Sequence, residues 1–338
     1  MAADVLLNVI IPTYNHQNYI AQAIESVLVQ NCNFNYQIII GEDCSTDDTR
    51  RICEKYESEN SGKIVLLKNN SNLGLVRNYQ RLFEACKGKY VAILEGDDYW
   101  VNLLKLQSQV DILEAYPEVG LVHTKCCSIY ENGQVKVNTH LYHSNKKSYD
   151  LYNDVILGNY TIVPVTACFR LELFRKYVDF NFCVANELVT IDSFMWPELA
   201  YHSKFHFIDE VTGYYRVLSN SISNSKNFDN FLRWYEKGIL TLNYYNFKYP
   251  LSKEDGLILY SKLGYLAVRI GLENRRKEFV LRNIGLVKDR SFKATSLLII
   301  ARNPRLYFLY PLHNYLISLL SSIKQFLYSR QFFTLRCL

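Results

Sequence analysis

The first 125 residues alternate short apolar runs with amphipathic segments, and this alternation limits the choice of fold more than any other feature of the chain. Apolar runs that suit strands buried on both faces occupy residues 5–11, 36–40, 64–67, 90–94 and 119–124. Helical spacing of apolar residues occupies the intervals 19–28, 50–59, 76–86 and 103–115. Strands that alternate with helices predict an α/β fold, a mostly parallel sheet with helices on both faces.

The rest of the chain is less regular and then becomes helical. Residues 125–165 are rich in Asn, Ser, Lys and Tyr, which predicts an insertion or a loop region. The helical pattern begins at about residue 227, and strand-like segments precede it at residues 165–170, 205–208 and 212–217. We therefore expect one α/β domain over residues 1–225 and a helical region over residues 226–338.

Composition excludes several classes of protein. The formal net charge of +5 includes no run of like charges, so a nucleic-acid-binding surface is not indicated. The nine cysteines are odd in number and form no CxxC pair, which favours a reducing compartment over a disulfide framework or a zinc site. No signal peptide opens the chain, and no uncharged apolar stretch reaches about 18 residues. We expect a cytoplasmic protein, either free or peripheral on the inner face of the cell membrane.

Polar residues follow the first three predicted strands. Ligands of parallel sheets bind beyond the carboxyl ends of the strands, so these residues are candidates for a site. The first strand is followed by Pro12 to Asn15, the second by Glu42 and Asp43, and the third by Gly74 and Arg77. The alternatives are an ordinary strand-to-helix turn for the first segment and a solvated helix arginine for Arg77.

An acidic cluster, Glu95, Asp97 and Asp98, follows the fourth predicted strand. Without a cation these carboxylates would repel one another and raise each other's pKa. Oxygen ligands suit Mg²⁺ or Mn²⁺, which commonly bind through one or two carboxylates together with substrate phosphates. The alternative is an acidic surface turn, which the buried strand before the cluster and the aromatic residues after it disfavour.

Four segments in this order resemble the family 2 glycosyltransferases of the GT-A fold. The segments are VIIPTYN from Val9, IGEDCSTDDT from Ile40, NLGLVRN from Asn72 and AILEGDDYW from Ala92, within a resemblance that covers residues 5–218. The resemblance implies a Rossmann-like, mostly parallel mixed sheet. It also implies an inverting hexosyltransferase that uses Mn²⁺ or Mg²⁺ and a nucleotide-diphosphate sugar, first of all a UDP-sugar.

The resemblance also assigns the residues around the donor. Asp98 corresponds to the direct metal ligand, and Asp97 lies beside it near the donor sugar and the ribose. Asp43 corresponds to the acid that meets the base or the ribose. The other implied nucleotide-sugar contacts are Pro12, Thr13, Tyr14, Asn15, Arg77, Glu95 and Arg216. Glu95 replaces the usual aspartate, so its contact with the metal is left open.

The catalytic base of the family corresponds best to Asp192, with Glu187 as the competitor and a helix N-cap as the structural alternative for Asp192. Leu218 replaces a histidine that is frequent in the family, so no role of that histidine is carried over. Thr166 is a candidate acceptor contact, and its alternative is a threonine packed in the sheet.

The family relation implies a saccharide or lipid-linked acceptor and a role in surface polysaccharide or lipopolysaccharide synthesis. A glycoside hydrolase and a non-catalytic sugar-binding protein are the alternatives from other classes. An apolar stripe over residues 312–327 predicts either a helix at a membrane surface or a helix packed on the catalytic domain or on a second copy in a homo-oligomer.

Overall fold

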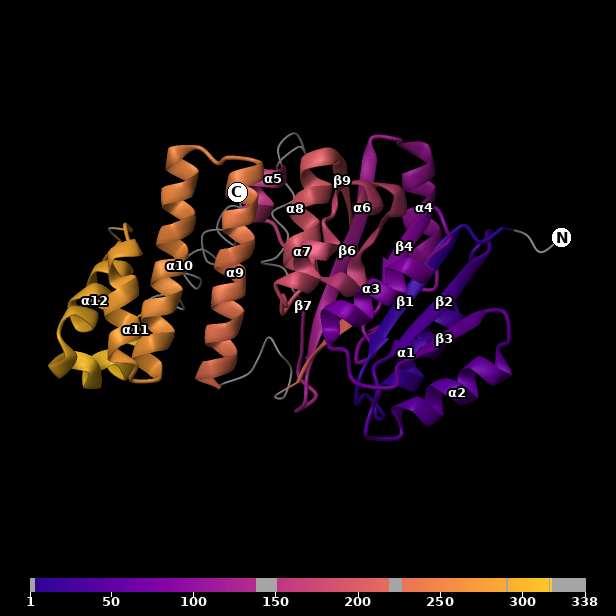
Figure 1. Ribbon diagram of the computed structural model, residues 1–338, viewed down its shortest axis with the longest axis horizontal. Coiled ribbons are helices and arrows are strands. Elements are labelled where there is room, and N and C mark those ends of the chain that lie inside the picture. The colour runs from indigo at the N-terminus through magenta and orange to yellow at the C-terminus, as the bar shows by residue number, and fades with distance from the viewer. Residues whose placement is uncertain (1–3, 138–150, 219–226, 290, 316, 318–338) are drawn as a thin grey trace, which may run out of the picture. The chain divides into compact units, whose positions relative to one another are not determined.

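The computed structural model describes residues 4–137, 151–218, 227–289, 291–315 and 317 (Figure 1). The chain divides into two compact units, Met1–Tyr249 and Pro250–Leu338. The first unit thus ends at Tyr249, whereas the sequence analysis places the boundary at residue 225.

The first unit is built on one mixed sheet of nine strands within the described residues. Its strands are β1 (Leu7–Thr13), β2 (Tyr36–Glu42), β3 (Ile64–Lys68), β4 (Tyr90–Ile93), β5 (Tyr99–Trp100), β6 (Val119–Tyr130), β7 (Val135–Val137), β8 (Cys168–Arg170) and β9 (Lys204–Val217). The strand order is β3-β2-β1-β4-β8-β6-β9-β5, with β7 paired to β6. The four strands β3, β2, β1 and β4 are parallel, β8 is antiparallel to both neighbours, and β6 is parallel to β9. The predicted mostly parallel mixed sheet is confirmed.

Helices cover this sheet because its strands are apolar on both faces. The helices of the unit are α1 (Ile20–Leu28), α2 (Thr49–Glu59), α3 (Leu75–Ala85), α4 (Lys105–Ala115), α5 (Leu151–Ile156), α6 (Leu171–Tyr177), α7 (Phe180–Ala185), α8 (Asp192–His202) and α9 (Phe228–Lys248). Of these, α5, α7 and α9 pack mainly on other helices. Every residue of β1 is buried. Leu7, Val9 and Ile11 join the core cluster that contains apolar residues of α1 and α4. Ile10 points to the opposite face because side chains alternate along a strand.

Strand β9 is longer than the sequence predicts. The segments 205–208 and 212–217 are one strand, which pairs with β6 along its length. Thr124 pairs with Ile208 and Lys125 with Val211, so Asp209 and Glu210 bulge out of the ladder. A β-bulge lets polar residues interrupt an apolar strand without ending it, which is why the sequence pattern suggests two strands.

Helix α9 packs with the first unit through a buried carboxylate on α8. Glu198 is 0% exposed, and its Oε1 lies 2.5 Å from Lys248 Nζ. The Tyr249 hydroxyl donates to Glu198 Oε2 at 3.0 Å. Because an unpaired buried carboxylate is costly, these contacts fasten the end of α9 to α8 and extend the unit beyond residue 225.

The second unit is wholly helical in its described part. It contains α10 (Lys253–Glu273), α11 (Lys277–Asn283), the 3₁₀ helix η4 (Ile284–Leu286), α12 (Phe292–Arg302) and the 3₁₀ helix η5 (Pro304–Leu309). Val268, Val280 and Leu297, from three different helices, share its core. No helix within the described residues is both long and apolar enough to cross a membrane. Most of the predicted stripe over residues 312–327 lies outside the described residues.

A lysine is buried in the core of the first unit. Lys105 is 1% exposed, and its ammonium lies 4.3 Å from the centre of the Trp100 ring and 2.6 Å from Gln109 Oε1. Burial lowers the pKa of Lys105 to about 7. The folded protein therefore begins to release this proton near neutral pH, whereas the unfolded chain still holds it.

We expect the free energy of unfolding to rise between about pH 7 and pH 8.5, by roughly 1 to 2 kcal/mol, because over this range the unfolded chain binds the Lys105 proton more tightly than the folded protein. Urea unfolding at several pH values measures this rise. The variant Lys105→Met removes the titrating group, so its stability should change less with pH over the same range. A slope equal to that of the unmodified protein would contradict the assignment to Lys105.

Candidate active site

The candidate site lies where the strand order reverses, between the carboxyl ends of β1 and β4. The chain runs from β1 outward to β3 and then returns to β4 on the other side of β1. In open α/β sheets the ligand-binding crevice lies beyond the strand ends at such a reversal. The backbone N–H of Gly96 donates to Pro12 O at 3.0 Å across this junction. A Cβ atom at Gly96 would lie 2.6 Å from Thr13 Oγ1, so only glycine permits this close approach.

The loop after β1 is tied to the loop after β2. Asn15 adopts a φ of 55°, its N–H donates to Ser45 Oγ at 2.9 Å, and its Oδ1 accepts from the N–H of Thr46 at 2.8 Å. Thr13 is buried, whereas the Tyr14 side chain is 41% exposed. Of the four residues predicted here, Tyr14 therefore presents an open aromatic surface, and Asn15 chiefly shapes the loop.

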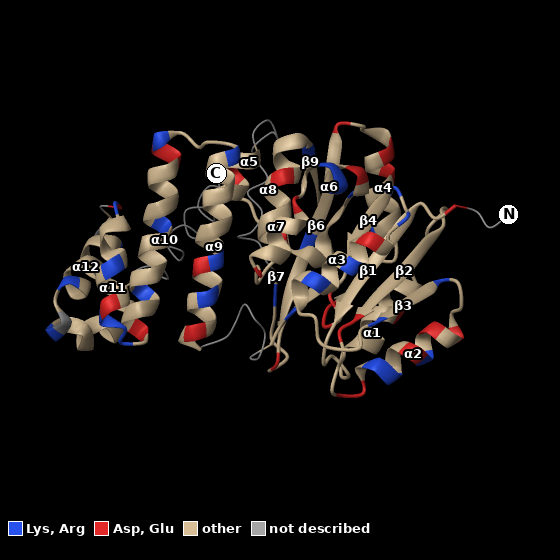
Figure 2. Ribbon diagram, in the orientation of Figure 1, with Lys and Arg blue, Asp and Glu red and all other residues tan. Residues whose placement is uncertain are grey.

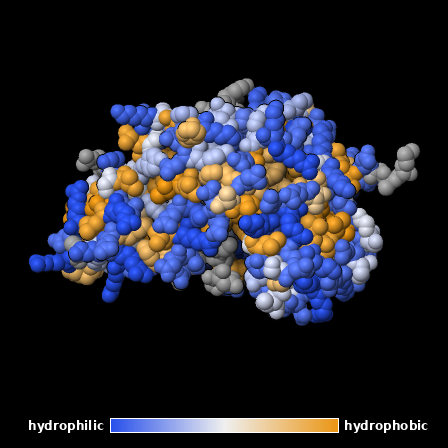
Figure 3. All heavy atoms as spheres, viewed as in Figure 1, coloured by the Kyte–Doolittle hydropathy of each residue, from blue (hydrophilic) through white to orange (hydrophobic). Residues whose placement is uncertain are grey.

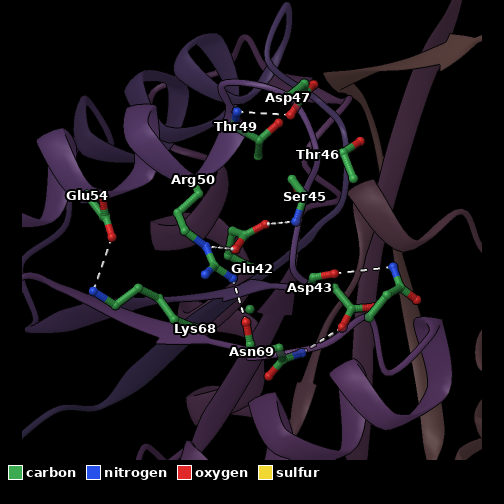
Figure 4. Close-up of polar contacts among 12 residues, drawn as sticks. Glu42, Asp43, Ser45, Thr46, Asp47, Thr49, Arg50, Glu54, Lys68 and Asn69 are labelled. Atoms are coloured by element: carbon green, nitrogen blue, oxygen red, sulfur yellow. Dashed lines mark hydrogen bonds and ion pairs between the residues drawn. The ribbon is translucent and has the colours of Figure 1, made fainter.

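Asp43 is buried and already bonded to the protein. Its carboxylate accepts from Asn69 Nδ2 at 2.6 Å and from the N–H groups of Leu73 and Gly74 at 2.8 and 2.9 Å (Figure 4). Gly74 has a φ of 81°, a conformation that favours glycine. Asp43 thus holds the β3–α3 loop against the crevice, and a base or ribose must share its remaining acceptor capacity with these bonds.

Glu42 serves the fold rather than the open crevice. It is 0% exposed, its Oε2 lies 2.5 Å from Arg50 Nε, and its Oε1 accepts from the N–H of Ser45 at 2.6 Å (Figure 4). These partners satisfy a carboxylate that would otherwise be buried and unpaired. The strand pattern alone does not distinguish Glu42, the last residue of β2, from Asp43, which follows it. Only the family resemblance selects Asp43.

The acidic cluster is the most unusual electrostatic feature of the site. Asp98 is 0% exposed, its Oδ1 accepts from the N–H of Arg216 at 2.8 Å, and its Oδ2 has no hydrogen-bond partner within the described residues. Burial, and then the charges of Asp97 and Glu95, raise the pKa of Asp98 well above its usual range. Burial, followed by Asp97 and Asp192, raises the pKa of Glu95 to about 8. The cluster is therefore short of positive charge.

Arg216, near the end of β9, holds the acidic loop in place. Its guanidinium donates to Asp97 O and to the side chain of Gln22 on α1. The same group lies 4.8 Å from the ring centre of Tyr19 and 4.7 Å from that of Tyr99. The sequence analysis predicts a nucleotide-sugar contact for Arg216, and this stays a prediction. In the structure the guanidinium connects the acidic loop with α1 and with Tyr99.

The two candidate bases lie in different environments. Asp192 begins α8, and burial raises its pKa against the opposing effect of the N–H groups at the helix start. Its charge acts on Glu95 and Tyr79, so it lies within electrostatic reach of the acidic cluster. Glu187 is exposed, has a φ of 47° and lies 3.8 Å from Arg233. Only Asp192 shares the environment of the cluster.

Several site residues carry no sequence signal that identified them. His16 has a pKa lowered by burial, although Asp97 and Asp47 oppose the shift, and its Nδ1 lies 3.2 Å from Thr13 Oγ1. The Tyr79 hydroxyl, on α3, donates to Glu95 Oε1 at 3.2 Å. Tyr79 lies on the buried face of an amphipathic helix, where a tyrosine looks like any core residue until its hydroxyl partner is seen.

Two further residues that the sequence analysis names as contacts, Arg77 and Thr166, have no structural feature that points to a ligand. Arg77 is exposed at the start of α3, one turn after the loop that Asp43 holds. Thr166 is 0% exposed, and its hydroxyl donates to Val163 O at 2.7 Å. Thr166 ends the 3₁₀ helix η2 (Pro164–Thr166) before β8, so it is a buried threonine beside the sheet and not a member of a strand. Its contact with an acceptor stays a prediction.

A divalent cation fits the acidic cluster on chemical grounds. The buried Asp98 Oδ2 lacks a partner, and Asp97 lies beside it in the chain. Among the described residues no group of three or more His, Cys, Asp or Glu side chains is placed to hold a metal. A site of one or two carboxylates that substrate phosphates complete is typical of Mg²⁺ and of similar hard cations.

Residues 8–178 match the model of the glycosyl transferase family 2. The chain is a family 2 glycosyltransferase. The matched segment contains the acidic cluster and the loops after β1, β2 and β3, so the resemblance predicted from the sequence is confirmed. Asp192 and Arg216 lie beyond the matched segment.

The chain is also similar to several relatives and, in its fold, to solved structures. The glycosyltransferase is 26% identical to an uncharacterised protein of Mycobacterium tuberculosis over 300 residues, which covers 89% of this chain and 81% of the relative. It is 37% identical over 109 residues to the E. coli UDP-Glc:alpha-D-GlcNAc-diphosphoundecaprenol beta-1,3-glucosyltransferase WfaP, over 32% of this chain and 41% of WfaP. Residues 1–349 of S. aureus TarS, solved with UDP-GlcNAc, superpose with a TM-score of 0.59 at 18% identity over 91% of this chain and 88% of that one. The chain covers 53% of a longer TarS chain.

Replacing Arg216 with Lys should lower the free energy of unfolding by roughly 1 to 2 kcal/mol, because an ammonium cannot bond to Asp97 O and Gln22 and also stack between two tyrosine rings. Urea unfolding measures the loss. The control Arg77→Lys changes an exposed arginine and should stay within about 0.5 kcal/mol of the unmodified glycosyltransferase. Equal losses in the two variants would show that Arg216 does not hold the loop.

Proposed function

We propose that this glycosyltransferase moves a sugar from a nucleotide-diphosphate donor to an acceptor hydroxyl with inversion, assisted by Mn²⁺ or Mg²⁺. The observation that carries the proposal is that acids from two distant segments, Asp192 on α8 and the cluster after β4, share one electrostatic environment. The charges of Asp97 and Asp192 both raise the pKa of Glu95. Asp192 can therefore act on the acceptor hydroxyl while the cluster after β4 acts on the leaving diphosphate.

Asp192 acts as the general base. Inversion by a single displacement needs a group that takes the proton of the attacking hydroxyl on the face opposite the diphosphate. Burial raises the pKa of Asp192, and a carboxylate with a raised pKa is a stronger base. No covalent intermediate is required, so no second carboxylate needs to act as a nucleophile.

Asp98 and Asp97 hold the cation, which when bound supplies Lewis-acid stabilisation to the charge that develops on the diphosphate. The unpartnered Asp98 Oδ2 supports this role. Arg216 positions the loop that carries both acids, through Asp97 O and the backbone bond to Asp98. Tyr14, Asp43 and the loop that Asp43 fixes bind the base and the ribose.

The donor and the acceptor are proposed from the relatives. TarS was solved with UDP-GlcNAc, and the name of WfaP describes transfer from UDP-Glc to a diphosphoundecaprenol-linked sugar. We therefore favour a UDP-sugar as donor, a saccharide or lipid-linked saccharide as acceptor, and a role in the synthesis of a surface polysaccharide or lipopolysaccharide. A panel of nucleotide-sugars, screened by thermal stabilisation in the presence of Mn²⁺, identifies the donor.

The variant Asp192→Asn should keep donor binding and lose transfer by roughly 10²- to 10⁴-fold, because the amide cannot accept the hydroxyl proton. Transfer is measured as release of the nucleotide diphosphate in the presence of acceptor, using the donor found in the panel. Glu187→Gln is the matched control, since this exposed glutamate is paired with Arg233, and it should retain near-normal transfer. The reverse pattern would move the role of base to Glu187.

Replacing Asp98 with Asn should abolish the part of UDP binding that depends on Mn²⁺. At about 100 times its dissociation constant, a ligand stabilises a protein by roughly 2.7 kcal/mol, which thermal unfolding detects readily. We expect UDP with Mn²⁺ to stabilise the unmodified chain more than UDP with EDTA, and the two conditions to be equal in the variant. The control Glu59→Gln, at the exposed end of α2, should behave as the unmodified chain. Stabilisation that EDTA leaves unchanged would remove the metal from the proposal.

A further inference from the structure

Charge is distributed unequally between the two units. Residues 250–338 contain 15 Lys and Arg against 5 Asp and Glu, so their formal charge is +10. Residues 1–249 contain 23 basic and 28 acidic residues, a formal charge of −5. The mild total of +5 therefore conceals a strongly basic helical unit, whose Lys and Arg residues appear on α10, α11 and α12 in Figure 2. Such a charge attracts an anionic partner.

The second unit also contains a pocket of about 590 Å³ with basic and apolar walls. One face of α10 contributes Leu257, Ile258, Ser261, Lys262 and Tyr265, and the segment into α12 contributes Lys288, Asp289 and Lys293. The N–H groups of Lys288 and Asp289 donate to Ser261 Oγ at 2.8 and 3.0 Å, which fixes this segment against α10. The pocket is therefore a built feature of the unit.

The ionic groups of this pocket favour an anion. Three lysines and one carboxylate line the pocket, and both oxygens of Asp289 accept bonds from Ser291, at 2.8 Å from its N–H and 2.8 Å from its hydroxyl. Lys293 Nζ lies 5.1 Å from the centre of the Tyr265 ring, which places its charge over an aromatic wall. The formal charge of the lining is +2, enough to bind a phosphate group.

Exposed apolar side chains distinguish a lipid from a soluble anion. Leu257 and Ile258, beside the lysines, are 50% and 42% exposed. Elsewhere in the unit, Ile299, Phe308 and Leu312 are each more than half exposed. Figure 3 shows hydrophobic side chains among hydrophilic ones on this part of the surface. A soluble anion gains nothing from such groups, whereas a bilayer surface binds basic and apolar side chains together.

We propose that this pocket binds the phosphate headgroup of an anionic phospholipid, with Lys262, Lys288 and Lys293 around the phosphate and Leu257 and Ile258 against the acyl chains. The second unit then holds the glycosyltransferase on an anionic bilayer surface. The proposal does not depend on the identity of the donor sugar or of the catalytic base.

The test is co-sedimentation of the full chain with vesicles of phosphatidylcholine, with and without phosphatidylglycerol. We expect binding only to vesicles that contain phosphatidylglycerol, and weaker binding as the salt concentration rises. The triple variant Lys262→Glu, Lys288→Glu and Lys293→Glu should reduce the partition coefficient by roughly 100-fold or more, since each lysine near an anionic surface contributes about fivefold. Thermal unfolding confirms that the variant remains folded.

A control variant with the same change in net charge distinguishes an effect of the pocket from an effect of the total charge. The variant Lys55→Glu, Lys87→Glu and Lys136→Glu changes three exposed lysines of the first unit and should bind vesicles almost as the unmodified chain does. In a further variant, Leu257→Asn with Ile258→Asn should weaken the binding that persists at high salt. Equal loss in the two lysine variants, or vesicle binding unaffected by the pocket variant, would overturn the proposal.

Discussion

The structure around the site depends on keeping the carboxylate of Asp98 buried with one of its oxygens unpartnered. The chain supplies a single backbone N–H, from Arg216, to this group, and its other oxygen has no partner within the described residues. A buried carboxylate in this condition destabilises the fold unless it is protonated or meets a cation. The surrounding bonds of Arg216, Gly96 and Pro12 hold the loop in this position against that cost.

The acids along this sheet edge fall into two groups, those whose charge is compensated by the protein and those whose charge is not. Glu42 and Asp43 have their charges satisfied by Arg50 and by backbone and amide N–H groups, and they stabilise the loops after β2 and β3. Asp98 and Glu95 instead have raised pKa values because burial and neighbouring acids leave their charges uncompensated. The difference arises from the partners of each acid, since all four residues lie at or just beyond the carboxyl ends of β2 and β4.

The sequence predicts the parallel part of the sheet well because continuous apolar runs leave little choice but strands buried on both faces. It also predicts a special role for the acidic cluster, because three neighbouring carboxylates after a buried strand repel one another unless a cation compensates their charge. It does not predict that the guanidinium of Arg216 is occupied by Asp97 and Gln22, since this depends on contacts between segments that are distant in the chain. The domain boundary shifts for the same reason, as the Glu198–Lys248 pair joins α9 to the first unit.

The distribution of charge becomes interpretable only once the boundary is known. Counted over the whole chain, 38 basic and 33 acidic residues suggest no particular partner. When the chain is divided at Tyr249, most acidic residues lie in the first unit, which carries the acidic cluster and Asp192, and basic residues predominate in the helical unit. The first unit, with a formal charge of −5, would by itself be repelled from an anionic surface. The basic second unit reverses that balance, so the proposed binding to an anionic surface requires no additional positive charge near the acidic cluster of the first unit.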